Sequence, residues 1–140
     1  MRFELATPSR MLVSADVDEV VAPGVEGYFG VLPGHAPLLT TLGSGEVTYR
    51  AGRAEQHLLV AGGFAEVQPD RVIILAEVAE APEEIDLGRA ERARQRAELR
   101  LAGRHPRGQE DEGEIDYNRA LAALARALAR IMVAGRVSVR

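Results

Sequence analysis

Glycine and proline are densest in one stretch of this 140-residue chain, Pro23-Gly-Val-Glu-Gly-Tyr-Phe-Gly-Val-Leu-Pro-Gly-His-Ala-Pro-Leu-Leu-Thr40. Glycine-rich segments also form phosphate-binding loops, but here no lysine follows and no strand-to-helix transition is evident. Turn chemistry therefore favours tight turns between short strands. His35 is a lone histidine within the stretch, and such a residue is more typical of a hydrogen bond in a turn than of catalysis.

Short β-type segments extend outward from this stretch. They are separated by glycine and proline and comprise residues 2–6, 11–13, 17–22, 46–50, 56–60, 63–68 and 71–77. Several alternate apolar and polar residues, as around Phe3 and Leu5 or Val47 and Tyr49, which is typical of strands with one face in a core. The short, regular spacing predicts an antiparallel sandwich or barrel. Because only 4% of the residues are aromatic, the core is expected to be mostly aliphatic.

The pattern becomes helical after Pro82. Residues 87–101 are rich in Ala, Arg, Glu and Leu, which are strong helix formers, and Asp86 stands at the N-cap position. A second helix is predicted from near Asp116 to about Ala134, before Gly135. The polar connection between the two segments predicts an antiparallel helical hairpin.

The two predicted helices differ in their apolar faces. Apolar side chains of the second recur at helical spacing and share one face: Leu121, Leu124, Ala125, Leu128, Ile131 and Met132. The stripe on the first is thin, consisting of Ala90, Ala93, Ala97 and Leu101. Burial of apolar area contributes about 25 cal/mol per Å². Because an alanine-rich seam buries little area, we expect the two helices of the hairpin to dock only weakly on each other.

Composition excludes several kinds of site. The chain has no cysteine and no lysine, because all 17 basic residues are arginine. Disulfides, thiolate metal sites, cysteine nucleophiles, lysine-containing phosphate loops and Schiff-base chemistry are therefore excluded. The three histidines, His35, His57 and His105, are far apart in sequence. We therefore expect neither a metal site nor an enzyme active on its own.

No segment reaches the roughly 18 consecutive apolar residues of a membrane helix. Residues 1–20 contain six charged residues and so lack the apolar stretch of a signal peptide. We expect a soluble protein made in the cytoplasm, with no direct membrane insertion. A partner would have to hold the chain at any membrane where it works.

Charge divides the chain in two. Residues 1–80 hold 5 arginines and 11 acidic residues, a net −6, whereas residues 81–140 hold 12 arginines and 10 acidic residues, a net +2. The arginines form helical stripes at Arg89, Arg92, Arg96 and Arg100 and at Arg119, Arg126 and Arg130. These stripes are consistent with a solvated or protein-docking face, an acidic partner or a polyphosphate ligand. Nucleic acid fits less well because the net charge is −4 and aromatic residues are scarce.

Three segments together resemble a known family. They are Gly27-Tyr-Phe-Gly-Val-Leu-Pro-Gly-His-Ala-Pro-Leu-Leu-Thr40, Gly62-Gly-Phe-Ala-Glu-Val67 and Ile115-Asp-Tyr-Asn-Arg-Ala120. In their order and spacing, the sequence is similar to the ε subunits of bacterial F-type ATP synthases over its whole length. The resemblance implies a β + α fold: an N-terminal antiparallel ten-stranded β-sandwich over residues 1–82, followed by a C-terminal antiparallel two-helix hairpin over residues 83–140.

The resemblance also implies partners. The family's members are non-catalytic subunits of the central stalk, which help to couple proton flow to rotation and ATP synthesis at the cytoplasmic face of the bacterial plasma membrane. By position, Glu26, Gly27 and Tyr28 would face the c-ring, and the segment with His35, Leu38 and Leu42 would lie near the γ subunit. The helices would either fold onto the sandwich or extend into the α/β catalytic head and inhibit ATP hydrolysis.

A regulatory nucleotide is the last implication of the resemblance. Some members bind ATP through an Ile/Leu-Asp-x-x-Arg-Ala motif, present here as Ile85, Asp86, Arg89 and Ala90. Further ligands would correspond to Glu80, Arg96, Arg126 and Arg130. No cofactor is required, and ATP would act as a regulator. The alternative interpretation of Asp86 is a plain helix cap, and the alternative for the arginines is a protein surface.

The sequence also fits another class of function: a free-standing β-sandwich adaptor whose arginine-rich hairpin binds an acidic protein or nucleic acid.

Three features depart from the family pattern. Gly88 is expected to loosen the start of the first helix, at about 1 kcal/mol relative to alanine. The connection over residues 103–114 is longer than usual, and residues 135–140 do not continue the helical pattern.

Overall fold

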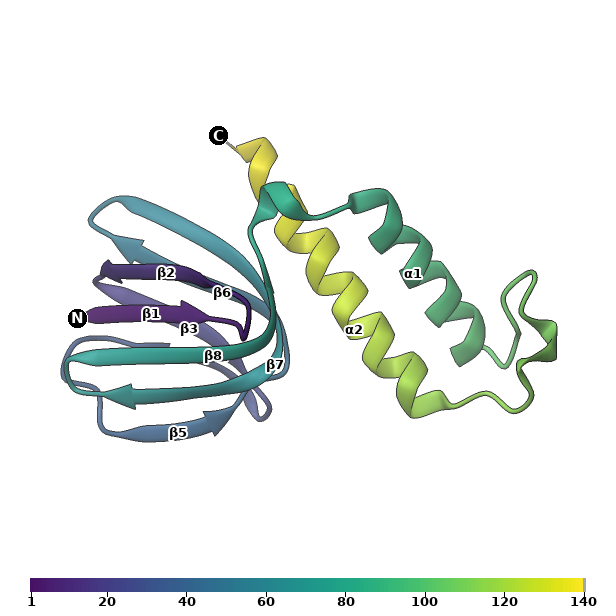
Figure 1. Cartoon of the computed structure of the whole chain (residues 1–140), viewed down its shortest axis with the longest axis horizontal. Coiled ribbons are helices and arrows are strands. Elements are labelled where there is room, and N and C mark those ends of the chain that lie inside the picture. The colour runs from purple at the N-terminus through teal and green to yellow at the C-terminus, as the bar shows by residue number, and fades with distance from the viewer. Residues whose placement is uncertain (140) are drawn as a thin grey trace.

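The computed structural model describes residues 1–139 and places eight strands before two helices (Figure 1). The strands are β1 (Arg2–Ala6), β2 (Met11–Asp16), β3 (Glu19–Gly24), β4 (Gly27–Val31), β5 (Leu38–Thr41), β6 (Ser44–Ala51), β7 (Ala54–Gln68) and β8 (Arg71–Glu80). They are followed by the 3₁₀ helix η1 (Pro82–Glu84), α1 (Leu87–Leu101), η2 (Glu110–Glu112), α2 (Tyr117–Ala134) and η3 (Gly135–Val139). The predicted β + α fold, a sandwich followed by a helical hairpin, is confirmed.

The strands form one sheet that folds over itself into two layers (Figure 1). Its order is β2-β1-β8-β7-β6-β3-β4, with β5 also paired to β7. All pairs are antiparallel except β1 with β8, which run parallel. Fully buried Phe3, Leu5, Val20, Val47 and Ile74 lie in the core between the layers, which is mostly aliphatic as predicted.

The expected count of ten strands is wrong for the described residues, which form eight. The sequence also predicted two segments, residues 56–60 and 63–68, where the structure has the single strand β7, which passes through Gly62 and Gly63. Both glycines have positive φ, and the pairing with β8 steps from Ala61–Val78 to Gly63–Ala76. The strand therefore continues through an irregularity instead of ending in a turn. Its first part pairs with β6 and its second with β5.

The two helices pack through alanine. Ala90 and Ala97 of α1 are buried, as are Ala120 and Ala127 of α2, because small side chains let the helix backbones approach closely. The predicted limits of α1 are confirmed, and the predicted cap at Asp86 accepts a hydrogen bond from the Arg89 N–H at 3.0 Å. Gly88 is the second residue of α1 and lies in its first turn.

The leucine face of α2 does not form this seam. Tyr117, Leu121, Leu128 and Met132 are all exposed, Leu121 by 59%. The helix instead contacts the sandwich through its C-terminal end, where Ala129 and Val133 pack with Leu59. The hairpin consequently projects from the sandwich, with its α1–α2 connection at the far end (Figure 1). None of the described helices is both long and apolar enough to cross a membrane.

Candidate functional site

A cavity of about 360 Å³ lies where the end of β8, the start of α1 and the middle of α2 meet. Its volume is in the range of small-molecule sites. Seven of the eight residues predicted to bind a nucleotide line it: Glu80, Asp86, Arg89, Ala90, Arg96, Arg126 and Arg130. Ile85 does not; its side chain packs against the apolar cluster of Leu59, Ala129 and Val133. The structure thus gathers residues that span 50 positions of the sequence.

The cavity has more positive charge than its own carboxylates neutralise. The Nε of Arg130 donates a hydrogen bond to Oε1 of Glu80 at 2.7 Å. Arg89, Arg96 and Arg126 have no ion pair among residues 1–139. Since a solvated arginine stripe on a helix is usually accompanied by acidic partners at i±4, three unpaired guanidiniums around one cavity point to an anionic ligand.

Asp86 has a structural role in addition to its place in the cavity. Its Oδ1 caps α1, which fixes the first helical turn and so places Arg89 and Ala90 at the cavity wall. Ala90 is almost fully buried in the helix seam. A larger side chain there would push the helices apart, so the alanine of the motif is required by packing.

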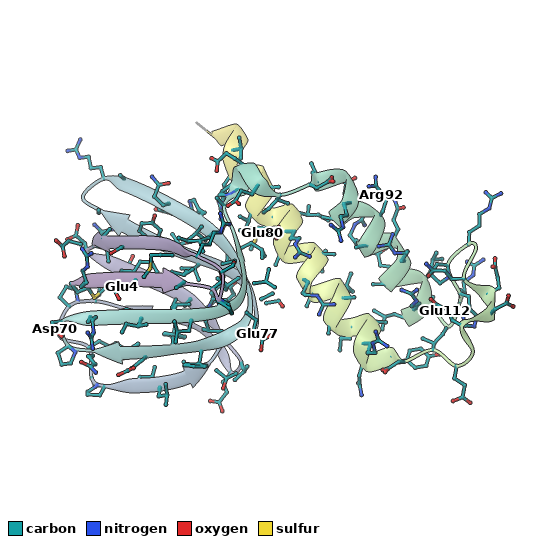
Figure 2. All side chains as sticks on the ribbon, in the orientation of Figure 1. Glu4, Asp70, Glu77, Glu80, Arg92 and Glu112 are labelled. Atoms are coloured by element: carbon teal, nitrogen blue, oxygen red, sulfur yellow. The ribbon has the colours of Figure 1, made fainter. Side chains whose placement is uncertain are left out.

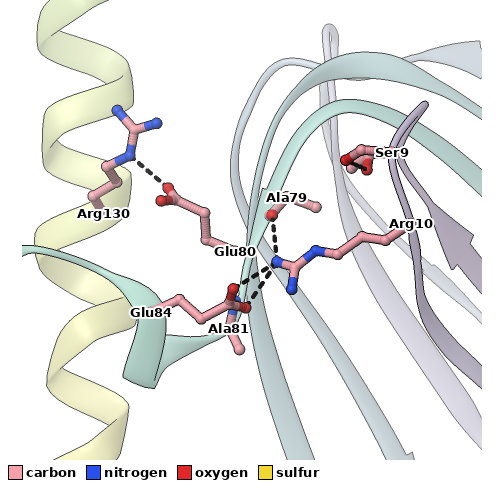
Figure 3. Close-up of polar contacts among 8 residues, drawn as sticks. Ser9, Arg10, Ala79, Glu80, Ala81, Glu84 and Arg130 are labelled. Carbon is pink, nitrogen blue, oxygen red and sulfur yellow. Dashed lines mark hydrogen bonds and ion pairs between the residues drawn. The ribbon is translucent and has the colours of Figure 1, made fainter.

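The segment that joins the two parts of the chain is fixed by Arg10, which lies between β1 and β2 (Figure 3). Its Nη2 donates to both carboxylate oxygens of Glu84, at 2.9 and 2.7 Å, and the Ala81 N–H donates to Oε1 at 2.9 Å. The hydrogen bond from Arg10, followed by that from Ala81, lowers the pKa of Glu84. Glu84 also lines the cavity. Sequence reasoning missed both side chains, because nothing local links positions 10 and 84.

A second cavity of about 510 Å³ lies toward the α1–α2 connection. Arg126 lines both cavities, and Arg119 and Asp116 line only the second. Arg100 is held there by Gln109 and by Glu112 of η2, at 3.1 Å from the latter. The long connection is therefore tied back to α1.

The residues predicted to face partners fall at two places. Glu26 is in the turn between β3 and β4, and the Val25 N–H bonds to the Thr41 carbonyl, so this turn adjoins the end of β5. His35 lies at the other end of β5, where the Gly34 N–H bonds to the Pro69 carbonyl. Its Nδ1 donates to the Ala36 carbonyl at 2.6 Å, as expected for a turn histidine.

Four further predicted contact residues lie in and beside strands β4 and β5 and differ in their surroundings. Tyr28 is in β4 and 56% exposed, and its hydroxyl accepts a hydrogen bond from the Glu46 N–H at 3.0 Å. Leu38 of β5 is partly exposed. Leu42 is only 2% exposed and belongs to the core, so its side chain is not available to a partner. Gly27, at the start of β4, has a φ of 129° and needs to be glycine for that conformation.

Two family models match consecutive parts of the chain. Residues 1–82 match the β-sandwich domain of the ATP synthase delta/epsilon chain, and residues 83–135 match its long α-helix domain. The chain belongs to the ATP synthase delta/epsilon family. Within this family it is an epsilon-type, non-catalytic subunit of ATP synthase. This membership displaces the alternative of a free-standing adaptor.

Epsilon chains from several bacteria are similar over almost their full length. That of Moorella thermoacetica is 49% identical over 138 residues, covering 98% of both chains. That of Nitratidesulfovibrio vulgaris is 47% identical and covers 96% of both. An epsilon chain of Syntrophotalea carbinolica is 48% identical over 97% of this chain and 94% of its own.

Solved structures share the fold at much lower identity. A chain of the Euglena gracilis mitochondrial ATP synthase, described as OSCP/F1/c-ring, superposes with a TM-score of 0.73 at 20% identity, covering 99% of this chain and 80% of that one. A chain of the Tetrahymena thermophila mitochondrial ATP synthase, described as central stalk/c-ring, superposes with a TM-score of 0.57 at 14% identity. The match covers 98% of this chain and 95% of that one. In this epsilon-type chain the cavity lies at the boundary of the two family domains. Glu80, labelled in Figure 2, comes from the first domain, and the arginines of the cavity come from the second.

Proposed function

We propose that this chain is a central-stalk subunit of a proton-translocating ATP synthase and that its helical hairpin is a nucleotide-controlled regulator of ATP hydrolysis. The sandwich contacts the γ subunit and the c-ring and helps to couple proton flow to rotation and ATP synthesis. The hairpin binds ATP while folded and inhibits hydrolysis when it extends toward the α/β head. The complex would hold the chain at the cytoplasmic face of the bacterial plasma membrane, as a peripheral subunit.

One observation carries the regulatory part of this proposal: seven predicted ligand residues line a single cavity in which three arginines lack carboxylate partners. Guanidinium groups match phosphate oxygens in geometry as well as charge. A ligand that bridges α1 and α2 would screen the mutual repulsion of these arginines. It would also stabilise the folded hairpin by mass action, by about 2.7 kcal/mol when the free ligand concentration is 100 times its Kd.

The partner contacts rest on a separate observation. Tyr117, Leu121, Leu128 and Met132 form an exposed apolar stripe on α2, which is unusual for the surface of a helix that has no partner. An extended helix would bury this stripe against other subunits. Co-purification from detergent-solubilised membranes tests the assembly: the chain should elute with an ATPase at low and moderate salt. Its absence from that complex would refute the stalk assignment.

Calorimetric titration of the isolated chain with ATP, and separately with ADP, tests the nucleotide site. We expect saturable one-to-one binding of ATP, weakened by Arg126→Ala by roughly 1–3 kcal/mol, since a charge-assisted hydrogen bond is lost. Arg92→Ala is the matched control. Arg92 is also an exposed arginine without an ion pair among the described residues, but it lines neither cavity (Figure 2). No heat at millimolar ATP, or equal loss in both variants, would refute a nucleotide site here.

A further inference from the structure

Glu46 of β6 is the one charged residue that is buried among the described residues, with 7% exposure. Both of its carboxylate oxygens accept hydrogen bonds from Arg136 in η3, which follows α2 directly. The Nε–Oε2 and Nη2–Oε1 distances are both 2.8 Å. Parallel bonds of this kind are the most favourable geometry between arginine and a carboxylate. A side chain near the end of the chain thus neutralises a carboxylate 90 residues away, on the face of the sheet where Leu59 packs against α2.

Neighbouring groups hold Glu46 in position to bind the Arg136 guanidinium. The Nδ1 of His57, on neighbouring strand β7, lies 3.4 Å from Oε2 of Glu46 and 3.2 Å from the Thr48 hydroxyl. Its Nε2 lies 3.5 Å from Glu55. The backbone of Glu46 is fixed by the hydroxyl of Tyr28. Because burial of an unpaired carboxylate is strongly unfavourable, the hairpin can cover Glu46 favourably only when Arg136 pairs with it.

The hairpin also contacts the sandwich through a small apolar cluster and a further ion pair. The shared apolar cluster contains only Leu59, Ala129 and Val133, with Ile85 packed beside it. Another polar contact, between Arg130 and Glu80, lies in the candidate nucleotide cavity, where a phosphate would compete with Glu80 for the guanidinium. Glu46 and Arg136 line neither of the two cavities described above. Their ion pair is therefore independent of the cavity and its ligand.

We propose that Glu46 and Arg136 form a latch that holds the C-terminal end of α2 on the sandwich and sets the balance between the docked and the released hairpin. The hydrogen bonds to Glu46 raise the pKa of Arg136, so its charge is retained throughout the physiological range. The role of this balance in controlling hydrolysis rests on the proposed function, whereas docking itself does not. Nucleotide in the cavity and the latch act on the same equilibrium through separate contacts.

The absence of cysteine makes a distance measurement straightforward. Spin labels at exposed positions in the β6–β7 turn and on α1, introduced as Arg53→Cys and Gln95→Cys, report the position of the hairpin relative to the sandwich in pulsed electron resonance. We expect one narrow distribution in the otherwise unchanged full chain. Arg136→Gln should raise the ratio of released to docked molecules at least tenfold, and Arg136→Lys should give an intermediate ratio, because it keeps the charge but loses one of the two parallel bonds.

Glu46→Gln tests the other half of the latch. It should also release the hairpin, and combining it with Arg136→Gln should add little, since both changes remove the same contact. Arg92→Gln serves as the control and should leave the distribution unchanged. Hydrogen exchange of the Val60 and Ile74 amides verifies that each variant retains its core. An unchanged distribution in Arg136→Gln, with the core intact, would overturn the latch; so would release of equal size in Arg92→Gln.

The same labelled chains separate the latch from the nucleotide proposal. If Arg136→Gln releases the hairpin but saturating ATP changes nothing in any variant, the latch stands and the nucleotide site fails. If ATP shifts the distribution but Arg136→Gln does not, the nucleotide site stands and the latch is refuted.

Discussion

Glu80 at the end of β8 and Arg130 in α2 are joined by a hydrogen bond of 2.7 Å, which connects the sandwich to the hairpin across 50 residues of sequence (Figure 3). Both side chains are partly exposed to solvent. The pair is therefore screened by salt and is worth less than a buried one. It nevertheless sets the position of Arg130 in the cavity, because the carboxylate holds the guanidinium on the β8 side.

A double-mutant cycle on this pair should give a coupling free energy of about 0.5–1 kcal/mol at low salt. Glu80→Gln and Arg130→Gln are each expected to lower the free energy of unfolding. The double variant should lower it by less than the sum of the two single decreases. The coupling should decrease when the salt concentration is raised to about 1 M. Urea unfolding of the four chains measures it. Strictly additive losses at low salt would show that the two groups do not interact in solution.

Gly63 of β7 should be intolerant of any side chain. Its φ is 110°, and a Cβ built there would lie 2.1 Å from the carbonyl oxygen of Leu75. Because that neighbour is backbone in the paired strand, it cannot move aside without breaking the β7–β8 ladder. Gly63→Ala is expected to lower the free energy of unfolding by roughly 3–5 kcal/mol.

Gly30→Ala in β4 is the matched control for that change. Its φ is not positive, and nothing lies within 4 Å of the Cβ position. Alanine there should be neutral or stabilising, by up to about 1 kcal/mol, since it restricts the unfolded chain. Denaturant unfolding compares the two variants. Similar stability of both would mean that β7 adjusts at the glycine pair more easily than the close approach suggests.

The helices were predictable because their signals are local. The Asp86 cap and the composition of the following residues predicted α1 correctly, and Asp116 caps α2 in the same way, with a 3.0 Å bond to the Arg119 N–H. The continuity of β7 was not predictable, because Gly62 and Gly63 resemble a turn unless the partners on both sides of the strand are known. Hydrophobic periodicity found the leucine face of α2 but not what covers it, since the helices approach through the smaller alanine side chains.

The candidate site was likewise predictable only where its signals are local. Its motif, from Ile85 to Ala90, is a local pattern, and the spacing of the arginines on α1 and α2 already placed them on common faces. The contacts of Arg10 with Glu84 and of Glu46 with Arg136 join residues 74 and 90 positions apart. No property of either segment alone indicates the other, so they emerge only from the tertiary fold. The burial of Leu42 was also not evident from the sequence, because a residue in a loop signature can point into the core.

Glu84 should make the stability of the linker between the two parts depend on pH. Hydrogen bonds from Arg10 and from the Ala81 N–H lower the pKa of Glu84 in the folded state. The stabilisation that ionised Glu84 gives the folded chain is therefore fully present above the ordinary glutamate pKa of about 4.3. It is lost as the pH falls through the lower pKa of the folded state. The stability difference between the unaltered chain and Glu84→Gln is expected to be constant from about pH 6 to 8 and to shrink below about pH 4.

Urea unfolding at a series of pH values measures this difference. Glu91→Gln is the control, since Glu91 is exposed on α1 and has no ion pair among the described residues. Its stability difference should be near zero at each pH. A difference for Glu84→Gln that grows on acidification would contradict the sign of the pKa shift.

Ala97 should not accept a larger side chain. It is 1% exposed in the seam between α1 and α2 and lines neither cavity. Ala97→Leu adds volume where the backbones approach closely, and we expect a loss of about 1–3 kcal/mol in the stability of the hairpin. Gln95→Leu, at an exposed position of the same helix, should change little. Thermal melting followed by circular dichroism at the helix minimum compares them, and equal melting curves would place Ala97 outside a packed seam.

The sandwich should fold without the helices. Its main core consists almost entirely of residues before position 80, and Leu59 belongs instead to a small separate cluster with Ala129 and Val133 of α2. A fragment of residues 1–84 is therefore expected to unfold cooperatively in urea, with lower stability because Leu59 and Glu46 lose their contacts with Val133 and Arg136. Glu46→Gln should destabilise the full chain, where it removes the ion pair with Arg136, and change the fragment little, because the hairpin that covers Glu46 is absent there. The difference between the two contexts is the decisive measurement. A fragment that fails to fold would show that the hairpin is required for the sandwich core.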